Sequence, residues 1–285
     1  MRDGSIYNYI TMTEVFPLFS EYRILKQIGA GGRAILYQAV STISNEIVAL
    51  KVSRSDVANP AEARAALHRE AALQATIDNP RVIAIKDVLD FSDSVVIVQE
   101  YVEGTTLWHW LERGSLEVEL KWWIATNLCE AIAAIHQAGI VHGDLKPLNV
   151  LVGRDGNPFL KITDFGEAHR IEDPAQSLAE VWGSPLYMSP EQCRGEASTT
   201  RSDVYSLGMI LYRLWAESLP YPMTTYEEAV HAHLHLMPDV PQNTPTELAA
   251  VILRALDKTP AQRQQTATEL LHELKACYNI YEGTD

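Results

Sequence analysis

The secondary-structure signals in this 285-residue sequence change type once, near Gly104, and this change limits the fold more than any other feature. Before Gly104, short β-rich runs are separated by turn residues, and one helical stretch begins at Asn59-Pro60. The β-rich runs cover 22–28, 35–40, 46–52, 82–89 and 94–101, and the helical stretch ends at about residue 77. The first hundred residues therefore predict a strand-rich unit that contains one helix.

The sequence after Gly104 is mostly helical, with two short strands and a loop-like stretch over 164–191. Helices are expected at about 107–113, 117–138, 200–216, 226–236, 246–256 and 266–278, and strands at 150–152 and 160–162. The resulting expectation is an α+β chain in which a small strand-rich lobe joins a larger helical lobe near 100–104.

Charge, cysteine and hydropathy patterns argue against several classes of protein. The formal net charge is −14 and no basic run occurs, which disfavours a nucleic-acid partner. Cys129, Cys193 and Cys277 are far apart, which argues against a disulfide framework and fits a reducing cytoplasm. No apolar run reaches the roughly 18 residues of a membrane helix, and the first twenty residues show no secretory signal. We therefore expect a cytoplasmic protein without a membrane partner; nothing in the sequence specifies an oligomeric state.

Two features of the strand-rich part point to phosphate binding. The stretch Gly29-Ala-Gly-Gly-Arg-Ala34, here called the glycine-rich loop, lies between two β-rich runs. Glycines allow the backbone to turn tightly and to bring its N–H groups close to phosphate, although ordinary hairpins are also glycine-rich. Lys51 ends an apolar strand and Glu70 lies on the following helix. Because a buried ammonium needs a carboxylate partner, a Lys51–Glu70 pair would aim Lys51 at a nucleotide.

The most informative segment is His142-Gly-Asp-Leu-Lys-Pro-Leu-Asn149, here called the catalytic loop. Asp144 can accept a hydroxyl proton, and Lys146 can neutralise charge on a transferring phosphoryl group. Asn149 offers a neutral oxygen to Mg²⁺, and Asp164, about twenty residues after Asp144, offers a charged one.

With these motifs in this order, the chain closely resembles the eukaryotic-like (Hanks-type) serine/threonine protein kinases of the bacterial branch, over about residues 22–276. The resemblance implies a bilobal α+β fold and transfer of the γ-phosphoryl group of ATP to a Ser or Thr hydroxyl of a protein substrate. It implies Mg²⁺, with Mn²⁺ as an alternative. The expected organisation is an extension at 1–20, a small lobe at 21–101, a large lobe at 102–280 and a tail at 281–285, with the hinge at 100–104.

The resemblance also assigns residues by their motif positions. The catalytic set is Asp144, Lys146, Lys51 and Glu70, and the metal ligands are Asn149 and Asp164. The nucleotide-binding set is Ile28, Gly29, Gly31, Gly32, Leu36, Ala49, Lys51, Gln99, Glu100, Val102 and Leu151. The segment 183–191 resembles a substrate-docking segment, Asp203 resembles the residue that braces the catalytic loop, and Arg263 resembles the partner of Glu191.

The sequence departs from the family pattern at four positions. Ala34 replaces the third loop glycine, Leu36 replaces the usual valine, and Gln99 replaces the usual apolar residue or Thr behind adenine. Gly143 replaces the arginine that reads a phosphate on the activation segment, which argues against strict control by such phosphorylation. Ser177 is a candidate autophosphorylation site, but an ordinary solvated loop serine is the favoured interpretation, and Ser184 is the other hydroxyl in the segment.

Two other functions compete with a protein kinase. His142-Gly143-Asp144 is also typical of small-molecule kinases of the aminoglycoside phosphotransferase type, although 183–191, Asp203 and Arg263 favour a peptide substrate. A pseudokinase scaffold is the other alternative, against which the complete catalytic set argues. A zinc site at His231 and His235 lacks a third ligand in the sequence, so we expect an ordinary solvent-facing helix there.

Overall fold

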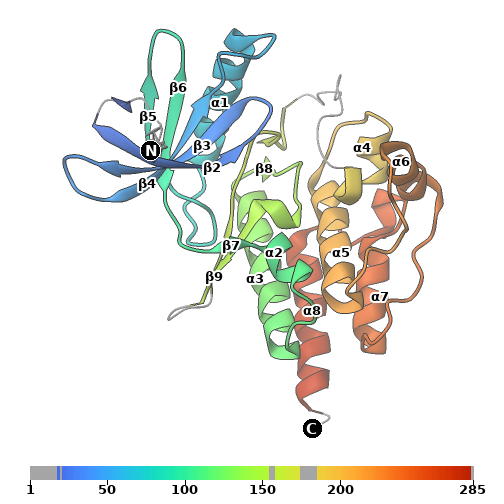
Figure 1. Cartoon of the computed structure of the whole chain (residues 1–285). Helices are drawn as coiled ribbons and strands as arrows, with labels where there is room; N and C mark the ends of the chain where they lie inside the picture. Colours follow the sequence, from blue (N-terminus) through green and yellow to red (C-terminus); the bar gives the residue numbers. More distant parts are fainter. Residues whose placement is uncertain (1–17, 20, 154–157, 174–184, 284–285) are drawn as a thin grey trace, which may run out of the picture.

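The computed structural model describes residues 18–19, 21–153, 158–173 and 185–283, and it has two lobes (Figure 1). The small lobe contains one antiparallel six-stranded sheet with the strand order β1-β2-β3-β4-β6-β5. Its elements are β1 (Leu18–Phe19), β2 (Tyr22–Ala30), β3 (Ala34–Ser41), β4 (Ile47–Ser53), α1 (Pro60–Gln74), β5 (Ile85–Asp90) and β6 (Val95–Glu100). The bilobal α+β expectation is confirmed.

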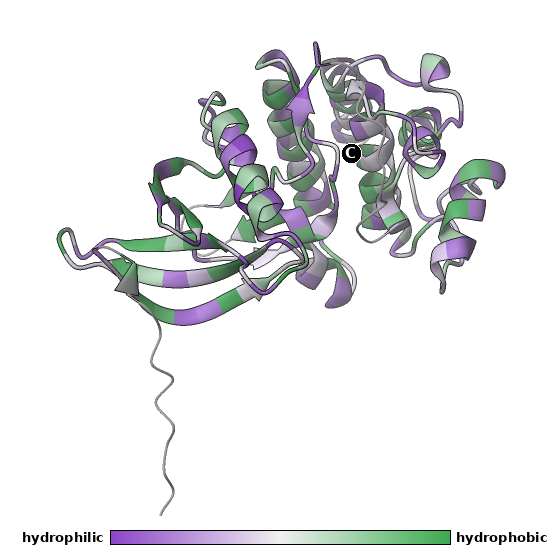
Figure 2. Ribbon diagram, turned by 90° about the horizontal axis from the view of Figure 1, so that it is seen from above, coloured by the Kyte–Doolittle hydropathy of each residue, from purple (hydrophilic) through white to green (hydrophobic). Residues whose placement is uncertain are grey.

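The inner strands of this sheet are buried on both faces, which explains their almost unbroken apolar sequence. Val96 and Val98 of β6 pack on one side with Val48 and Leu50 of β4, whereas Ile97 faces the other side, toward α1. In Figure 2, the outer strands instead carry polar and apolar residues in turn. Helix α1 is capped at its N-terminus by Asn59, whose side chain accepts a hydrogen bond from the backbone N–H of Glu62. The sheet and α1 together hold Lys51 and Glu70 face to face.

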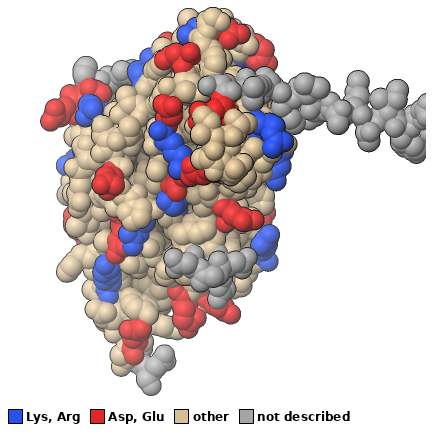
Figure 3. Space-filling view, turned by 90° about the vertical axis from the view of Figure 1, so that its left-hand side faces the viewer, with Lys and Arg blue, Asp and Glu red and all other residues tan. Residues whose placement is uncertain are grey.

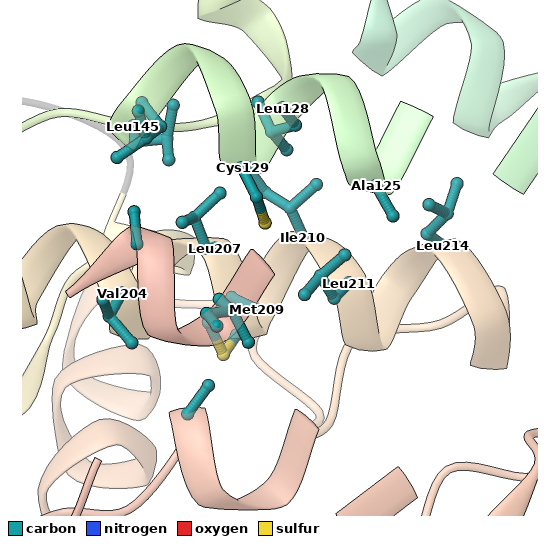
Figure 4. Close-up of a cluster of buried hydrophobic side chains, with 14 of the residues drawn as sticks. Ala125, Leu128, Cys129, Leu145, Val204, Leu207, Met209, Ile210, Leu211 and Leu214 are labelled. Atoms are coloured by element: carbon teal, nitrogen blue, oxygen red, sulfur yellow. The ribbon is translucent and has the colours of Figure 1, made fainter. Parts of the chain in front are cut away.

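The large lobe is built on helices that surround α5. Its helices are α2 (Leu107–Glu112), α3 (Val118–Gln137), α4 (Pro190–Cys193), α5 (Thr200–Ala216), α6 (Tyr226–His235), α7 (Thr246–Ala255) and α8 (Ala267–Glu282). Short strands form a β10-β9-β7 sheet and a β11-β8 pair: β7 (Thr105–Thr106), β8 (Ile140–Val141), β9 (Val150–Gly153), β10 (Phe159–Ile162) and β11 (His169–Arg170). Figure 4 shows the core where Leu128 and Cys129 of α3 face Leu207 and Ile210 of α5. This core gives the catalytic loop a rigid base.

The lobes meet at residues 101–104, where Gly104 permits a close backbone approach. A Cβ atom at Gly104 would lie 2.9 Å from Phe159 Cζ and 3.0 Å from the carbonyl oxygen of Val152. The glycine is therefore required by the packing of this segment against β9 and β10. None of the helices in the described ranges is both long and apolar enough to cross a membrane.

Two sequence expectations differ from the structure at the edges of the small lobe. The strand expected at 82–89 begins only at Ile85, because the preceding residues pair with the large lobe: the N–H of Ile83 donates to Ile162 O at 3.0 Å. Within the expected extension 1–20, Leu18–Phe19 pair with β2, and the ring of Phe19 packs 5.6 Å from that of Phe91. Residues 1–17 lie outside the described part of the chain.

The expectation of a solvent-facing helix at 231–235 is wrong for His233, which is fully buried. Its Nδ1 lies 2.9 Å from the hydroxyl of Tyr205, and Lys258 donates to the hydroxyl of Tyr221 at 2.8 Å in the same cluster. Burial, with Lys258 nearby, lowers the pKa of His233 to about 4, so its imidazole is neutral at pH 7. His231 and His235 stack with ring centroids 5.0 Å apart, and the described residues contain no group of three or more His, Cys, Asp or Glu side chains able to hold a metal.

Lys and Arg side chains are scattered among Asp and Glu on the face shown in Figure 3. Among the described residues on this face, no continuous basic area is present. In the small lobe, local ion pairs join Arg54 to Asp56 at 2.6 Å and Lys86 to Glu46 at 2.7 Å. This face therefore offers no extended cationic track of the kind that neutralises a phosphate backbone.

Candidate active site

Lys51, Glu70 and Asp164 form one ion-paired group between the lobes. The Nζ atom of Lys51 lies 2.5 Å from Glu70 Oε1 and 2.8 Å from Asp164 Oδ1. Lys51 is on β4 opposite Ile97 of β6, Glu70 is on α1, and Asp164 follows β10. The Glu70 side chain is only 2% exposed, whereas that of Asp164 is 45% exposed. The structure thus brings together three residues that are up to 113 positions apart in the sequence.

The charges in this group stabilise one another. Burial lowers the pKa of Lys51, but the carboxylates of Asp164 and Glu70 outweigh burial, and the pKa lies above its ordinary value. Burial raises the pKa of Asp164, yet Lys51 outweighs burial and lowers this pKa to about 2. At neutral pH the site therefore presents a fixed ammonium beside an ionised, half-exposed carboxylate.

The backbone of Asp164 adopts an uncommon conformation that directs its carboxylate toward Lys51. Its φ is +65°, in the left-handed region that non-glycine residues seldom occupy. The next residue, Phe165, is buried, and its ring packs against His142 with centroids 5.1 Å apart. This packing links the Asp164 segment to the start of the catalytic loop.

The catalytic loop places Asp144, Lys146 and Asn149 around a common point. The Nζ atom of Lys146 lies 2.5 Å from Asp144 Oδ2, and the amide nitrogen of Asn149 donates to the Asp144 carbonyl oxygen at 2.8 Å. Pro147–Asn149 form a 3-10 turn that returns the chain toward Asp144. The three side chains share this region, although Asn149 is buried whereas Asp144 and Lys146 are partly exposed.

Asp203, near the start of α5, holds the first two residues of the catalytic loop through their backbone N–H groups. Its Oδ2 accepts the N–H of His142 at 2.8 Å, and its Oδ1 accepts the N–H of Gly143 at 2.9 Å. His136 Nε2 also lies 2.9 Å from Oδ2. Burial raises the pKa of Asp203, but the bond and charge of His136 outweigh burial, and the pKa is lowered. The bracing role that the resemblance implies for Asp203 thus has a direct structural counterpart.

Gly143 occupies a position that an L side chain fits poorly. Its φ is +77°, and a Cβ atom would lie 2.7 Å from the carbonyl oxygen of Glu167. The Gly143 carbonyl accepts a hydrogen bond from Gln192 Nε2 at 2.7 Å. Sequence reasoning did not identify Gln192; its distance of 49 residues from Gly143 leaves no local signal.

We expect Gly143→Ala to destabilise the protein more than Gly139→Ala. Gly139 has a similar φ of +75° but nothing within 4 Å of an added Cβ, so both variants carry the same left-handed cost of about 1–2 kcal/mol. Only the first adds a contact with Glu167, which costs about 1–3 kcal/mol more. Differential scanning fluorimetry measures the difference. Equal melting temperatures for the two variants would contradict the expected clash.

The residues expected to bind a nucleotide lie on facing strands and on both lobes. Gly29, Gly31 and Gly32 lie at the β2–β3 turn, Leu36 pairs with Lys51, and Ala49 pairs with Gln99. Ile28 is exposed on β2, Val102 lies in the connecting segment, and Leu151 lies on β9 of the large lobe.

Two of these residues have side-chain contacts that the motif did not reveal. The carboxylate of Glu100 accepts from Lys161 at 2.6 Å and from the N–H of Ala84 at 2.8 Å, which ties β6 to the large lobe. Gln99 is buried, and its Nε2 has no hydrogen-bond partner within the described residues. This buried amide N–H makes the space around position 99, opposite Ala49, more polar than an apolar residue at that position would.

The oxygen donors at the site fit a hard divalent cation. Asp164 offers a half-exposed, ionised carboxylate, and Asn149 uses its amide nitrogen on Asp144, so its amide oxygen faces away from that residue. Carboxylate and amide oxygens are the donors that Mg²⁺ takes in proteins. The chemistry of the donor set therefore matches the cation that the sequence predicts.

The docking segment is fixed to the large lobe through Glu191. Arg263 donates to both of its carboxylate oxygens at 2.9 Å. A recess beside Asp144 is lined by Gly143, Leu145, Tyr187, Met188, Gln192 and Ser206. Residues 183–184 and the candidate phosphorylation site at 177 lie outside the described residues.

Comparisons with known proteins show which family the sequence matches. A family model described as protein kinase domain matches residues 22–274. The chain is 36% identical over 267 residues to the serine/threonine-protein kinase PrkC of Bacillus subtilis, covering 90% of this chain and 40% of that protein. It is 34% identical over 275 residues to the probable serine/threonine-protein kinase PknB of Lactococcus lactis, covering 92% and 43%.

A third relative is the serine/threonine-protein kinase PknB of Mycobacterium tuberculosis, with 32% identity over 280 residues, 94% of this chain and 44% of that protein. The chain thus spans less than half the length of these relatives. The family match covers most of the chain, and the ion-paired group, the catalytic loop and the Glu191–Arg263 pair occupy the positions that the motifs assign to them. The chain therefore belongs to the protein kinase family.

Proposed function

We propose that the chain is an ATP-dependent serine/threonine protein kinase that transfers the γ-phosphoryl group to a protein hydroxyl. The observation that supports this most is the paired set of cations and carboxylates around Asp144 and Asp164. Lys51 donates a hydrogen bond to Glu70, and both Lys146 and Asn149 donate to Asp144. These bonds hold each group in place before a substrate binds. Preorganised charge of this kind supplies most of the catalysis in phosphoryl transfer.

In the proposed mechanism, Asp144 orients the substrate hydroxyl and takes its proton as the new O–P bond forms. The bond from the γ-phosphorus to the bridging oxygen breaks, and ADP leaves with that electron pair. Lys146, 2.5 Å from Asp144, stabilises negative charge on the transferring group, while Lys51 holds the phosphates. Asn149 and Asp164 would hold Mg²⁺, or Mn²⁺ as the alternative; the bound cation neutralises phosphate charge.

The glycine-rich loop would cover the phosphates, and the backbone of Glu100 and Val102 would hold adenine, with Ile28, Leu36, Ala49 and Leu151 as the apolar walls. The docking segment, which Glu191 and Arg263 hold to the large lobe, supports a peptide rather than a small alcohol as the acceptor. The three free cysteines fit a reducing compartment, so we place the activity in the cytoplasm.

Intact mass after incubation with Mg²⁺ and ATP tests the proposal, with Asp144→Asn as the control. We expect the parent alone to gain mass in phosphate steps, and peptide mapping then locates the modified residue and tests Ser177. A parent that transfers phosphate to neither itself nor a Ser/Thr peptide library would contradict a protein kinase. Transfer to an aminoglycoside or choline instead would favour the small-molecule kinase, and a melting curve insensitive to nucleotide would favour a scaffold.

A further inference from the structure

Arg33 and Glu167 form an ion pair that connects the two lobes, here called the interlobe pair. Arg33 lies in the glycine-rich loop, and Glu167 follows Asp164-Phe-Gly166 in the large lobe. The Nη1 atom of Arg33 lies 2.8 Å from Glu167 Oε1, and the two side chains are 45% and 31% exposed. Neither residue belongs to the nucleotide, metal or catalytic sets described above.

The backbone of the glycine-rich loop is fixed on the small-lobe side. The N–H of Arg54 donates to Arg33 O at 2.9 Å, and its guanidinium donates to Gly31 O at 3.3 Å. Gly31 in turn donates to Ala34 O at 2.8 Å, and Asp56 holds the Arg54 guanidinium through two bonds. The Arg33 backbone is thus part of an ordered turn. The Arg33 side chain connects that turn to the large lobe through Glu167.

The other end of the pair is fixed as well. The carbonyl oxygen of Glu167 lies so close to Gly143 that a Cβ there would be only 2.7 Å away. Burial raises the pKa of Glu167, and the charges of Asp144 and Asp164 raise it further, while the Arg33 guanidinium opposes them. Since Lys146 pairs with Asp144 and Lys51 with Asp164, Arg33 is the cation that pairs with this third carboxylate.

We propose that the interlobe pair is a latch that holds the glycine-rich loop against the large lobe while a nucleotide lies beneath it. This inference rests on the proposed function, because it concerns the nucleotide's phosphates. Arg33 and Glu167 are then positioning residues: the loop closes when the pair forms, and product ADP leaves when the pair opens. A partly exposed ion pair has a modest strength, which suits a contact that must break in every turnover.

Nucleotide release measures the latch directly. We expect Arg33→Gln and Glu167→Gln each to speed dissociation of a fluorescent ADP analogue by about two- to fivefold. The double variant should release no faster than either single one, and exchanging the charges, Arg33→Glu with Glu167→Arg, should restore slow release. Lys86→Gln is the matched control, because it breaks a comparably exposed small-lobe pair, with Glu46 at 2.7 Å, that involves neither Arg33 nor Glu167.

The KM for ATP and the salt dependence of ADP release would not change in this way if the interlobe pair only stabilised the fold. We expect the two single variants to raise the KM for ATP equally and added salt to bring the parent's release rate toward theirs. A fall in kcat for Arg33→Gln alone would overturn the latch, because the guanidinium would then act on the phosphoryl group. A parent that binds no nucleotide would overturn both proposals, whereas a parent that binds it, with release unaltered in the variants, would overturn the latch alone.

Discussion

Asp144→Asn is expected to slow phosphoryl transfer by about 10²–10⁴-fold while leaving nucleotide affinity almost unchanged. The variant keeps the size and shape of the side chain but loses the carboxylate that takes the hydroxyl proton. The hydrogen bond from Lys146 at 2.5 Å and that from Asn149 to the Asp144 carbonyl at 2.8 Å show how closely this group is held. Radiolabel transfer to a peptide measures the rate, and titration with an ATP analogue measures the affinity.

Asp78→Asn is the matched control for this prediction, because Asp78 is exposed and follows the end of α1. We expect it to behave as the parent in both assays. A loss of nucleotide affinity in Asp144→Asn as large as its loss of rate would show that the carboxylate supports the fold of the site rather than the chemistry. A rate within tenfold of the parent's would assign proton transfer to another group.

The sequence predicts the centre of the site well because its chemistry is carried by fixed residue types at ordered positions. Lys51 and Glu70 are predicted as a pair because a buried ammonium requires a carboxylate, and the structure places them 2.5 Å apart. The β-rich run that contains Val95–Glu100 is predicted by its apolar composition, which burial on both faces demands.

Contacts that depend on tertiary packing could not be predicted from the sequence. The interlobe pair joins positions 134 residues apart with no periodicity to reveal it. His233 is a polar residue on an amphipathic helix, so the sequence predicts that it is exposed. Only the packing of α6 against Tyr205 shows that it is buried. The residues before Ile85 have apolar side chains suited to a strand, but the backbone groups of Arg81 and Ile83 bond to Ile162 of β10, whereas Ala84 bonds to β6.

The Glu191–Arg263 pair is the contact whose loss we expect to destabilise the fold most. The Arg263 side chain is 0% exposed; besides Glu191, it donates to Arg201 O at 2.8 Å and to Asp257 O at 2.7 Å. Burial raises the pKa of Glu191, but the bonds and charge of Arg263 outweigh burial, and the pKa falls below its ordinary value. The pair holds the docking segment onto α5 and the turn before α8, so its effect reaches the candidate active site.

Arg263→Met should destabilise the protein by about 3–5 kcal/mol, because it leaves a buried carboxylate without its cation. For a chain of this size, that corresponds to a fall in melting temperature of about 10 °C. Adding Glu191→Gln to Arg263→Met should recover part of the loss, since the uncompensated charge is then removed as well. Arg194→Met breaks an exposed pair with Glu196 and should melt at almost the same temperature as the parent. If the double variant melted no higher than Arg263→Met, the loss would come from packing and from the bonds to Arg201 and Asp257 rather than from the buried charge.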